Sequence, residues 1–450
     1  MKSTSKEQLE KLLQALNKHD DALVDDIYEQ IEAIDLAEEI EALKKTQLEY
    51  LCSHIDDEKL AEILEESDED LQVDIIDCLE DKRILTLFNY ISKDNIVDIL
   101  GQLPIGKRKN LVNLMKADEK KIIEQLLGYD EETAGGLMTT EYIALNAKLT
   151  VMNALIKIKE IAPKTEVIDT IFVVNEKKQL VGTADLRDIL SSDKDTQLEA
   201  LMDDHVISVY PETDQEEVSL LVSKYDLTTI PVVNKNHALL GIITVDDIID
   251  VIQEEHTEDM LQMHGVNKEE SLDSTIMESI KMRLPWLIVN LATAFFASFV
   301  IKVFEGTIEQ VVALSATMTI VTGMGGNAGS QTLSILIRSI ALGEIHFKDC
   351  WPALRKEIWV GFINGFVTGV ITGIIVYLLY GNIYLGIIIC IAMVGNLIVS
   401  GVFGFIIPVT LKALHLDPAL ASSIFLTTAT DILGFFIFLE LANLFLPYLI

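Results

Sequence analysis

Residues Ile171–Leu190 read IFVVNEKKQLVGTADLRDIL, and residues Ile230–Ile249 repeat the pattern as IPVVNKNHALLGIITVDDII. Both copies place β-branched residues on either side of a polar turn and end in a charged helical pattern, which predicts two strands followed by a helix. The flank before each copy repeats as well, as Leu137-Met138-Thr139 and Leu201-Met202-Asp203. This duplication predicts two α/β domains in tandem, over residues 131–200 and 201–255.

The segment before the duplication reads as a series of short amphipathic helices. Apolar residues recur at i, i+3 and i+4 in stretches such as Asp57–Glu66 and Asp70–Leu79, and an Asp or Ser often stands where an N-cap belongs. Short helices in series tend to stack as helical hairpins. We therefore expect an all-α superhelical domain over residues 1–130.

Charge divides the chain into two parts. Of the 35 Lys and Arg and the 70 Asp and Glu, only 8 and 9 lie after Thr275, so residues 1–275 hold 27 basic and 61 acidic residues, a net charge of −34. Such a segment does not bind nucleic acid, because affinity for phosphate backbones comes from Lys and Arg. Self-repulsion on this scale disfavours a compact state unless cations relieve it. The excess of acid therefore points to a cation as a ligand of this part.

Residues 281–450 contain five apolar runs that are long enough to cross a bilayer. They are roughly Leu284–Phe304, Val311–Ile337, Ile358–Tyr380, Ile383–Leu411 and Ala419–Leu446. The chain opens polar and charged, without a signal peptide, so we expect a cytoplasmic N-terminus. Of the eight Lys and Arg in this part, only Lys302 then lies in an outer loop, as the positive-inside rule requires. The sequence predicts a multi-pass protein of the cell (inner) membrane, in contact with lipid and with its C-terminus outside.

Polar residues interrupt two of these runs. Asp431 lies in the middle of the fifth run, and a carboxylate at bilayer depth costs at least ~2.5–3.5 kcal/mol. The second run contains GGNAGSQ (Gly325–Gln331), whose glycines would let a helix or a hydrated ion come close. A helix-packing face of small residues is the alternative reading. The amide of Asn327, and more weakly those of Asn364 and Asn396, needs a polar partner at this depth. We predict a cation pathway past Asp431.

The duplicated unit resembles a pair of CBS domains (named after cystathionine β-synthase). The second copy, Gly241-Ile242-Ile243-Thr244-Val245-Asp246-Asp247, fits the pattern Gly, two hydrophobic residues, Thr or Ser, two free positions and Asp. In CBS pairs that bind adenine nucleotides, the hydroxyl and the Asp hold phosphate and ribose, which implies Thr244 and Asp247 as ATP ligands. The first copy has Asp185 where the hydroxyl belongs, and an acid would repel phosphate. We expect at most one nucleotide site, in the second CBS domain, and the alternative is a turn without a ligand.

The order of the parts resembles the MgtE magnesium channels and transporters over essentially the whole chain. The most specific matches are Arg283-Leu284-Pro285-Trp286-Leu287, the stretch Gly325–Gln331, and Asp417-Pro418-Ala419 ahead of Thr430-Asp431. The resemblance implies a homodimer that moves Mg²⁺, with no other protein partner. Mg²⁺ prefers six oxygens and gives up water reluctantly, so few direct ligands should hold it through its water shell. The candidate pore residues are Asp431, Asn327, Gly325, Ala328 and Thr427.

An acidic segment precedes the first apolar run. Asp246–Asp259 reads DDIIDVIQEEHTED and continues toward the membrane, so we expect a connecting helix over residues 256–280. Like charges at i, i+3 and i+4 disfavour a helix unless cations lie between them. Our hypothesis is that cytosolic Mg²⁺ bridges this segment to the helical domain and closes the pore; a merely solvated acidic helix is the alternative. The candidate regulatory residues are Asp94, Asp98, Asp246, Asp247, Asp250, Glu254, Glu255, Glu258 and Asp259.

Other function classes find less support in the residues. The apolar runs hold no Ser/His/Asp set, paired acids or cysteine nucleophile, so we expect no enzymatic activity. The lone Asp431 argues against an anion channel, and the pore lacks the His and Cys ligands that soft metals prefer. Two alternatives stay open: a broader transporter that also carries Co²⁺ or Mn²⁺, and a Mg²⁺ transporter coupled to another ion.

Overall fold

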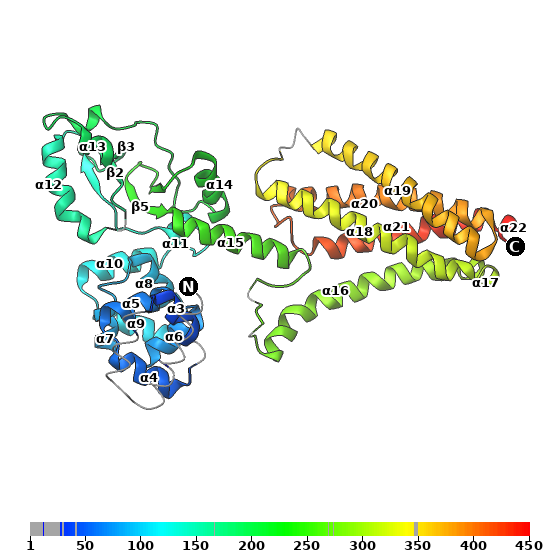
Figure 1. The fold of residues 1–450 in the computed structure, drawn as a ribbon, viewed down its shortest axis with the longest axis horizontal. Coiled ribbons are helices and arrows are strands. Elements are labelled where there is room, and N and C mark those ends of the chain that lie inside the picture. The colour runs from blue at the N-terminus through cyan, green and yellow to red at the C-terminus, as the bar shows by residue number, and fades with distance from the viewer. Residues whose placement is uncertain are drawn as a thin grey trace. The chain divides into compact units, whose positions relative to one another are not determined.

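A computed structural model of the chain describes residues 12, 28, 31–40, 43–165, 167–268, 270–272, 274–345 and 350–450. Most of the first 30 residues of the predicted helical domain therefore lie outside the described part. Contacts along the chain form two compact units, Met1–Val251 and Ile252–Ile450. Figure 1 labels their helices and strands.

The first unit begins with a series of short helices, and each helix n packs on helix n+2. α3 packs on α5, α4 on α6, α5 on α7, α6 on α8, α7 on α9 and α8 on α10. Asp56 and Asp68 cap α5 and α6, because each side chain accepts a backbone N–H of the first turn at 2.9 Å. The predicted helical domain is therefore present as a stack of short helices (Figure 1), and its superhelical course stays a prediction. The helices are α3 (Ala33–Ile40), α4 (Lys45–His54), α5 (Asp57–Glu65), α6 (Glu69–Asp77), α7 (Asp81–Leu87), α8 (Lys93–Gln102), α9 (Ile105–Leu114) and α10 (Ala117–Leu126).

The predicted duplication forms two similar hairpins in the rest of this unit. β2 pairs with β3 and β4 with β5, both antiparallel, and the register pairs Val173 with Gly182 in one hairpin and Val232 with Gly241 in the other. β1 adds a parallel strand beside β2. The elements are α11 (Ala134–Leu137), β1 (Ala144–Asn146), α12 (Val151–Ile161), η1 (Ala162–Lys164), β2 (Thr170–Val174), β3 (Leu180–Asp185), α13 (Leu186–Ser191), η2 (Leu198–Ala200), α14 (Gln215–Tyr225), β4 (Thr229–Val233), β5 (Leu239–Thr244) and α15 (Val245–Gln262).

The two copies exchange their repeated flanks. Thr139, from the flank of the first copy, forms two backbone hydrogen bonds of 2.8 and 2.9 Å with Ile242 of the second hairpin. Asp203, from the flank of the second copy, does the same with Thr183 of the first hairpin at 2.8 and 3.0 Å. Gly241 is required at this crossing, because a Cβ there would lie 2.6 Å from the carbonyl oxygen of Thr139. Each hairpin is thus completed by residues from the other copy.

The second unit is a bundle of long helices. Among the described residues, four helices are long and apolar enough to cross a membrane: α16 (Ile276–Val303), α19 (Cys350–Tyr380), α20 (Ile383–Ala413) and α21 (Ser422–Leu444). α18 (Ala313–Ala341) covers the second predicted span, but its Gly, Thr, Ser and amide residues make it less apolar than the other four. The fifth crossing therefore stays a prediction. The short helices α17 (Glu305–Gln310) and α22 (Leu446–Leu449) complete the unit.

The connecting segment differs from the expected single helix over residues 256–280. α15 starts inside the second CBS copy and already ends at Gln262, and α16 begins only at Ile276. Gly265 explains the early end, since its φ of +71° is left-handed and cannot continue an α-helix. The first apolar helix also begins two turns before the predicted Leu284.

Glycines let α19 and α20 approach each other closely. Gly361, Gly365, Gly369 and Gly373 recur every four residues on α19, and a Cβ on any of them would lie 2.5–2.9 Å from the backbone of α20. Small residues at this spacing are a common helix-packing device in membranes. The α19–α20 pair is therefore held by backbone contact.

We expect that a Gly365→Leu substitution prevents correct assembly of the bundle. A Cβ at Gly365 would lie 2.7 Å from Cα of Val394, so the helices must separate, at a cost of more than about 3 kcal/mol. Size-exclusion profiles and thermal unfolding in detergent would detect the loss. Gly306→Leu is the matched control, because nothing lies within 4 Å of its Cβ position. Equal melting temperatures of the two variants would show that close packing at Gly365 does not stabilise the α19–α20 pair.

Candidate functional site

α18 and α21 meet around one amide of α20. A Cβ at Gly325 of α18 would lie 2.2 Å from Nδ2 of Asn396, and a Cβ at Gly434 of α21 would lie 2.8 Å from Oδ1 of the same residue. Both glycines therefore lie at the level of the Asn396 side chain.

The two helices run antiparallel at this point. Gly329, which follows on α18, meets Leu426, which precedes Gly434 on α21. Asp431 lies about one turn before Gly434, so it is level with the turn that follows Gly325 on α18. The predicted pore residues on that turn are Asn327 and Ala328.

The carboxylate of Asp431 is available to a cation. It is half-buried, and in the described part of the chain no side chain hydrogen-bonds to it or forms an ion pair with it. The neighbouring hydroxyls bond to their own helix, from Thr428 to the carbonyl of Ile424 at 2.7 Å and from Thr430 to that of Thr427 at 3.0 Å. Thr427 is exposed one turn before Asp431.

α18 presents one polar stripe and one buried face. The exposed stripe recurs at helical spacing and consists of Gly323, Asn327, Gln331, Ser334 and Arg338. Amides on a membrane-length helix need water or a second polar surface. Gly325 lies on the opposite, buried face, and its carbonyl accepts a hydrogen bond from Ser400 at 2.7 Å. Gly325 therefore lets α20 come close to α18, while Asn327 faces outward and Ala328 is half-buried.

The end of α15 is held by the start of α21. The carbonyl of Gln262 accepts the backbone N–H of Ala421 at 2.9 Å, and that of Met263 accepts the N–H and the hydroxyl of Ser423 at 3.1 and 2.5 Å. The side chain of Met263 packs into a small apolar cluster made of Leu333, Ile337, Ala419 and Leu426. The acidic helix thus ends on the helix that carries Asp431.

Four carboxylates gather at this junction. Burial raises the pKa of Asp259 to about 7, with further increases from the charges of Asp417, Glu255 and Glu258. Burial also raises the pKa of Asp417, and the hydrogen bond of 2.7 Å that it accepts from the N–H of Ala419 partly offsets this rise. Lys268 pairs with Glu258 at 3.3 Å and neutralises one of the four charges. Asp417 was not among the predicted ligands, although the Asp417-Pro418-Ala419 motif before the last helix marked its position.

No three carboxylates of this junction bring their oxygens within 4.8 Å of one another. Within the described ranges, the one group of three acidic or His ligand atoms that lie within 4.8 Å of one another is Asp203, Asp204 and His205, which are all exposed. A cation at the junction would therefore be bridged through its own water, as suits Mg²⁺. Four other predicted residues are simply exposed: Asp98, Asp246, Asp250 and Glu254.

A second acidic pair lies inside the first unit. Asp94 of α8 is 5% exposed, and its Oδ1 has no hydrogen-bond partner. Burial raises the pKa of Asp247 to about 6; the Thr244 hydroxyl, which donates to Asp247 at 2.6 Å, opposes this rise, and the charge of Asp94 adds to it. The structure therefore brings Asp94, Asp247 and Thr244 together. Two neighbouring carboxylates suit a cation, or a hydroxyl that donates to them such as that of a ribose, better than a phosphate.

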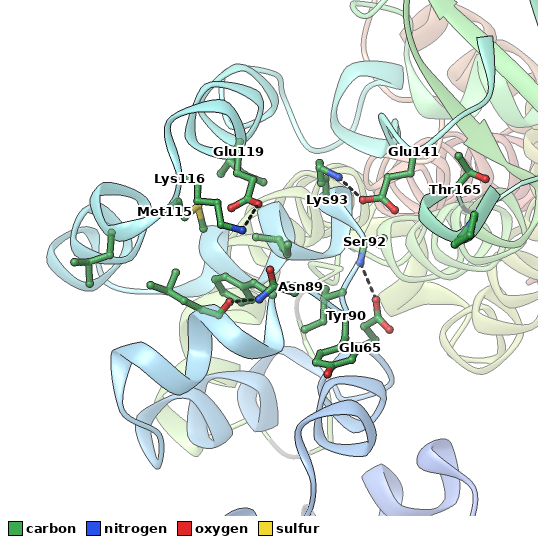
Figure 2. A pocket seen from close by; sticks show the side chains of 17 residues that line it. Glu65, Asn89, Tyr90, Ser92, Lys93, Met115, Lys116, Glu119, Glu141 and Thr165 are labelled. Carbon is green, nitrogen blue, oxygen red and sulfur yellow. Dashed lines mark hydrogen bonds and ion pairs between the residues drawn. The ribbon is translucent and has the colours of Figure 1, made fainter. Parts of the chain in front are cut away.

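A pocket of about 820 Å³ in the same unit is lined by the helical stack and by the first CBS copy. Figure 2 shows Lys93 paired with Glu141 and Lys116 paired with Glu119, so both ammonium groups are neutralised. With Glu65 the pocket holds more acids than bases, which does not favour a phosphate ligand. The Lys93–Glu141 pair instead connects α8 to the segment before β1.

An acidic helical stack, a CBS pair and a bundle of apolar helices define a class, the multi-pass membrane transporters with CBS domains. The sequence profile of the divalent cation transporter domain MgtE matches residues 318–441, that of the MgtE intracellular N domain matches 31–132, and the CBS profile matches 134–195 and 198–254. The chain belongs to the MgtE family of magnesium transporters.

Relatives support this assignment over nearly the full length. The chain is 32% identical over 403 residues to a magnesium transporter MgtE of Bacillus subtilis, covering 90% of this chain and 89% of the relative. It is 31% identical to that of Thermus thermophilus, covering 97% and 98%. Among solved structures, the cytosolic domain of a Mg²⁺ channel MgtE in complex with ATP is 32% identical, with a TM-score of 0.52, and covers 54% of this chain and 99% of its own.

Proposed function

We propose that this protein is a Mg²⁺ channel of the cell membrane that closes when cytosolic Mg²⁺ binds its acidic parts. The observation that carries the proposal is Asp431, a half-buried carboxylate without a partner among the described residues, level with the amide of Asn327 on the neighbouring helix. The name of a solved relative, a Mg²⁺ channel, supports the same ion.

The pathway would follow the polar stripe of α18. Asp431 supplies the charge, and Asn327, Ala328 and Thr427 supply oxygens toward the water shell of the ion, while Gly325 sets the spacing of the helices. α18 has 29 residues, which at 1.5 Å per residue give about 43 Å, more than the ~30 Å of a bilayer core. We therefore count α18 as the fifth span. An odd number of spans puts the two termini on opposite sides, and the Lys/Arg bias then favours a cytoplasmic N-terminus and an outer C-terminus.

A second copy of the chain would complete the pathway. The polar stripe of α18 and the carboxylate of Asp431 are costly on a lipid-facing surface, so we infer a homodimer in which two such faces enclose a shared aqueous path. α16 adds a large apolar surface, since Phe295, Phe296 and Phe299 are 65–69% exposed. Lipid or the second copy would cover that surface.

Closure would use the two acidic sites. Mg²⁺ between Asp94 and Asp247 would hold the helical stack on the CBS pair. Mg²⁺ at Glu255, Glu258, Asp259 and Asp417 would hold the end of α15 on α21. Without the ion, repulsion among these carboxylates favours separation and an open pore, so the ion shifts the equilibrium by binding the closed state better. Asp98, Asp246, Asp250 and Glu254 remain candidate ligands at the exposed rim of α8 and α15.

Ion flux into liposomes tests the proposed function against its alternatives. We expect purified protein to pass Mg²⁺ down its gradient without added Na⁺ or a pH difference, and to pass Co²⁺ and Mn²⁺ more slowly. Flux that requires a Na⁺ or H⁺ gradient would establish a coupled transporter. Equal flux of all three ions would establish a broader divalent cation transporter, and no flux of Mg²⁺ would refute the proposal.

ATP is expected to bind once per chain, at the second CBS copy. The solved relative in complex with ATP supports this, and Asp247 would accept hydrogen bonds from the ribose. Loss of such a charged hydrogen bond in Asp247→Asn should weaken binding by about 10-fold, as measured by calorimetry. Asp246→Asn, which alters an exposed neighbour, is the control. Unchanged affinity in Asp247→Asn would remove Asp247 from the ATP site.

A further inference from the structure

Asn396 is a buried amide at the meeting point of three helices. It is 0% exposed, and its Nδ2 donates to the carbonyl of Val321 on α18 at 2.8 Å. Gly325 and Gly434 leave room for this amide, because a Cβ on either would lie 2.2 or 2.8 Å from it. The side chain is therefore wedged between α18 and α21.

Ser400 repeats this contact one turn later on α20. Its hydroxyl lies 2.7 Å from the carbonyl oxygen of Gly325 and 2.8 Å from that of Asn396. One further turn on, Gly404 approaches the carbonyl oxygen of Gly329, which would lie 2.9 Å from a Cβ there. Asn396 and Ser400 therefore donate hydrogen bonds to two carbonyls of α18 that are one turn apart.

The oxygen of Asn396 has no partner in the described part of the chain. Its Oδ1 is among the buried side-chain atoms without a hydrogen bond. An apolar residue of similar size would avoid the cost of burying this oxygen. A contribution to stability alone therefore explains the amide poorly. Its position between Gly325 and Gly434 instead suits a residue that sets how α18 and α21 lie relative to each other.

We infer that Asn396 is a positioning residue for the cation pathway. The inference rests on the proposed function, in which Asp431 and the turn at Asn327 and Ala328 act on one ion. Asp431 is one turn from Gly434, and Ala328 is one turn from Gly325. By holding those two glycines at one level, Asn396 keeps the carboxylate and the opposing turn of α18 at the same depth. It touches no ion itself.

Substitutions that change side-chain size at the Asn396–Gly325 contact test the inference in the full-length protein in liposomes. We expect Asn396→Ala to raise the Mg²⁺ concentration for half-maximal flux about 10-fold and to lower the ratio of Mg²⁺ to Ca²⁺ flux, because small displacements of a binding group weaken its action strongly. Gly325→Ala should lose about 10-fold or more in flux per folded protein, since its methyl group meets the amide. The double variant should recover most of that loss, because the methyl group then occupies the space of the amide.

Asn364→Ala is the matched control, an exposed amide on α19 that should behave as wild type. A merely structural role would lower the amount of folded protein and leave the half-maximal concentration and the ion ratio unchanged, and that result would overturn the inference. A double variant no better than Gly325→Ala would overturn it as well. Failure of the proposed function is recognised separately, because the wild type itself would then carry no Mg²⁺.

Discussion

Asp431→Asn is expected to reduce Mg²⁺ flux by about 100-fold. A dication about 5 Å from one carboxylate gains about 6–7 kcal/mol at an effective dielectric constant of ~20, before desolvation is subtracted. If about 40% of this survives, its loss corresponds to roughly 100-fold in rate. The amide keeps the size and the hydrogen-bonding oxygen of the side chain, so the bundle should remain folded.

The measurement is the initial rate of Mg²⁺ entry into liposomes that contain equal amounts of folded protein. Glu440→Gln is the matched control, because this exposed carboxylate lies on the same helix about two and a half turns away. We expect it to keep the wild-type rate. A rate in Asp431→Asn within a factor of two of wild type would exclude Asp431 from the ion path.

If the proposed closure holds, Asp259→Asn combined with Asp417→Asn should make Mg²⁺ flux nearly indifferent to cytosolic Mg²⁺. Removing two of the four charges relieves repulsion when the ion is absent and removes ion binding when it is present. Both effects reduce the difference between the open and closed populations. We expect the ratio of flux without Mg²⁺ to flux in millimolar Mg²⁺ on the soluble-domain side to fall about 10-fold, since a ligand shifts a population only by its differential affinity.

The control for this variant changes charge without touching the junction. Asp203→Asn combined with Asp204→Asn removes two exposed carboxylates of the CBS pair and should leave the flux ratio unchanged. If both double variants behave alike, then net charge governs closure and the four-acid junction does not. Asp94→Asn separately tests the site in the first unit by the same ratio.

Local patterns predicted most of the architecture. The duplication at Ile171–Leu190 and Ile230–Ile249, the short helical periods and the apolar runs are all local signals, and the structure contains the corresponding elements. The spacing of Gly361, Gly365, Gly369 and Gly373 is an equally local signal for close helix packing, although none of the predictions rested on it. Gly265 likewise marks the early end of α15, but only its backbone angle shows that this glycine terminates the helix.

The candidate sites depended on contacts that sequence spacing does not encode. The expected neighbours Asp431, Asn327 and Ala328 do share one level, yet Gly325 turned out to face the bundle interior, because only the packing against Asn396 decides which face of α18 is buried. Asp417 lies far from Asp259 in the chain, so its charge acts on Asp259 only after the start of α21 has docked on the end of α15. Asp94 and Asp247 are likewise far apart in the chain, and the charge of one acts on the other only in the folded first unit.

The exchanged flanks of the CBS copies have a consequence for biosynthesis. Residues around Thr183 cannot finish their hairpin until Asp203 has left the ribosome, and Thr139 waits for Ile242, about a hundred residues later. Such long-range pairings slow folding, because the chain loses the entropy of closing a long loop before the stabilising contacts form. The CBS pair is therefore complete only when β5 has emerged, just ahead of α15 and the first membrane helix, whereas the helical stack can pack before that through its own local contacts.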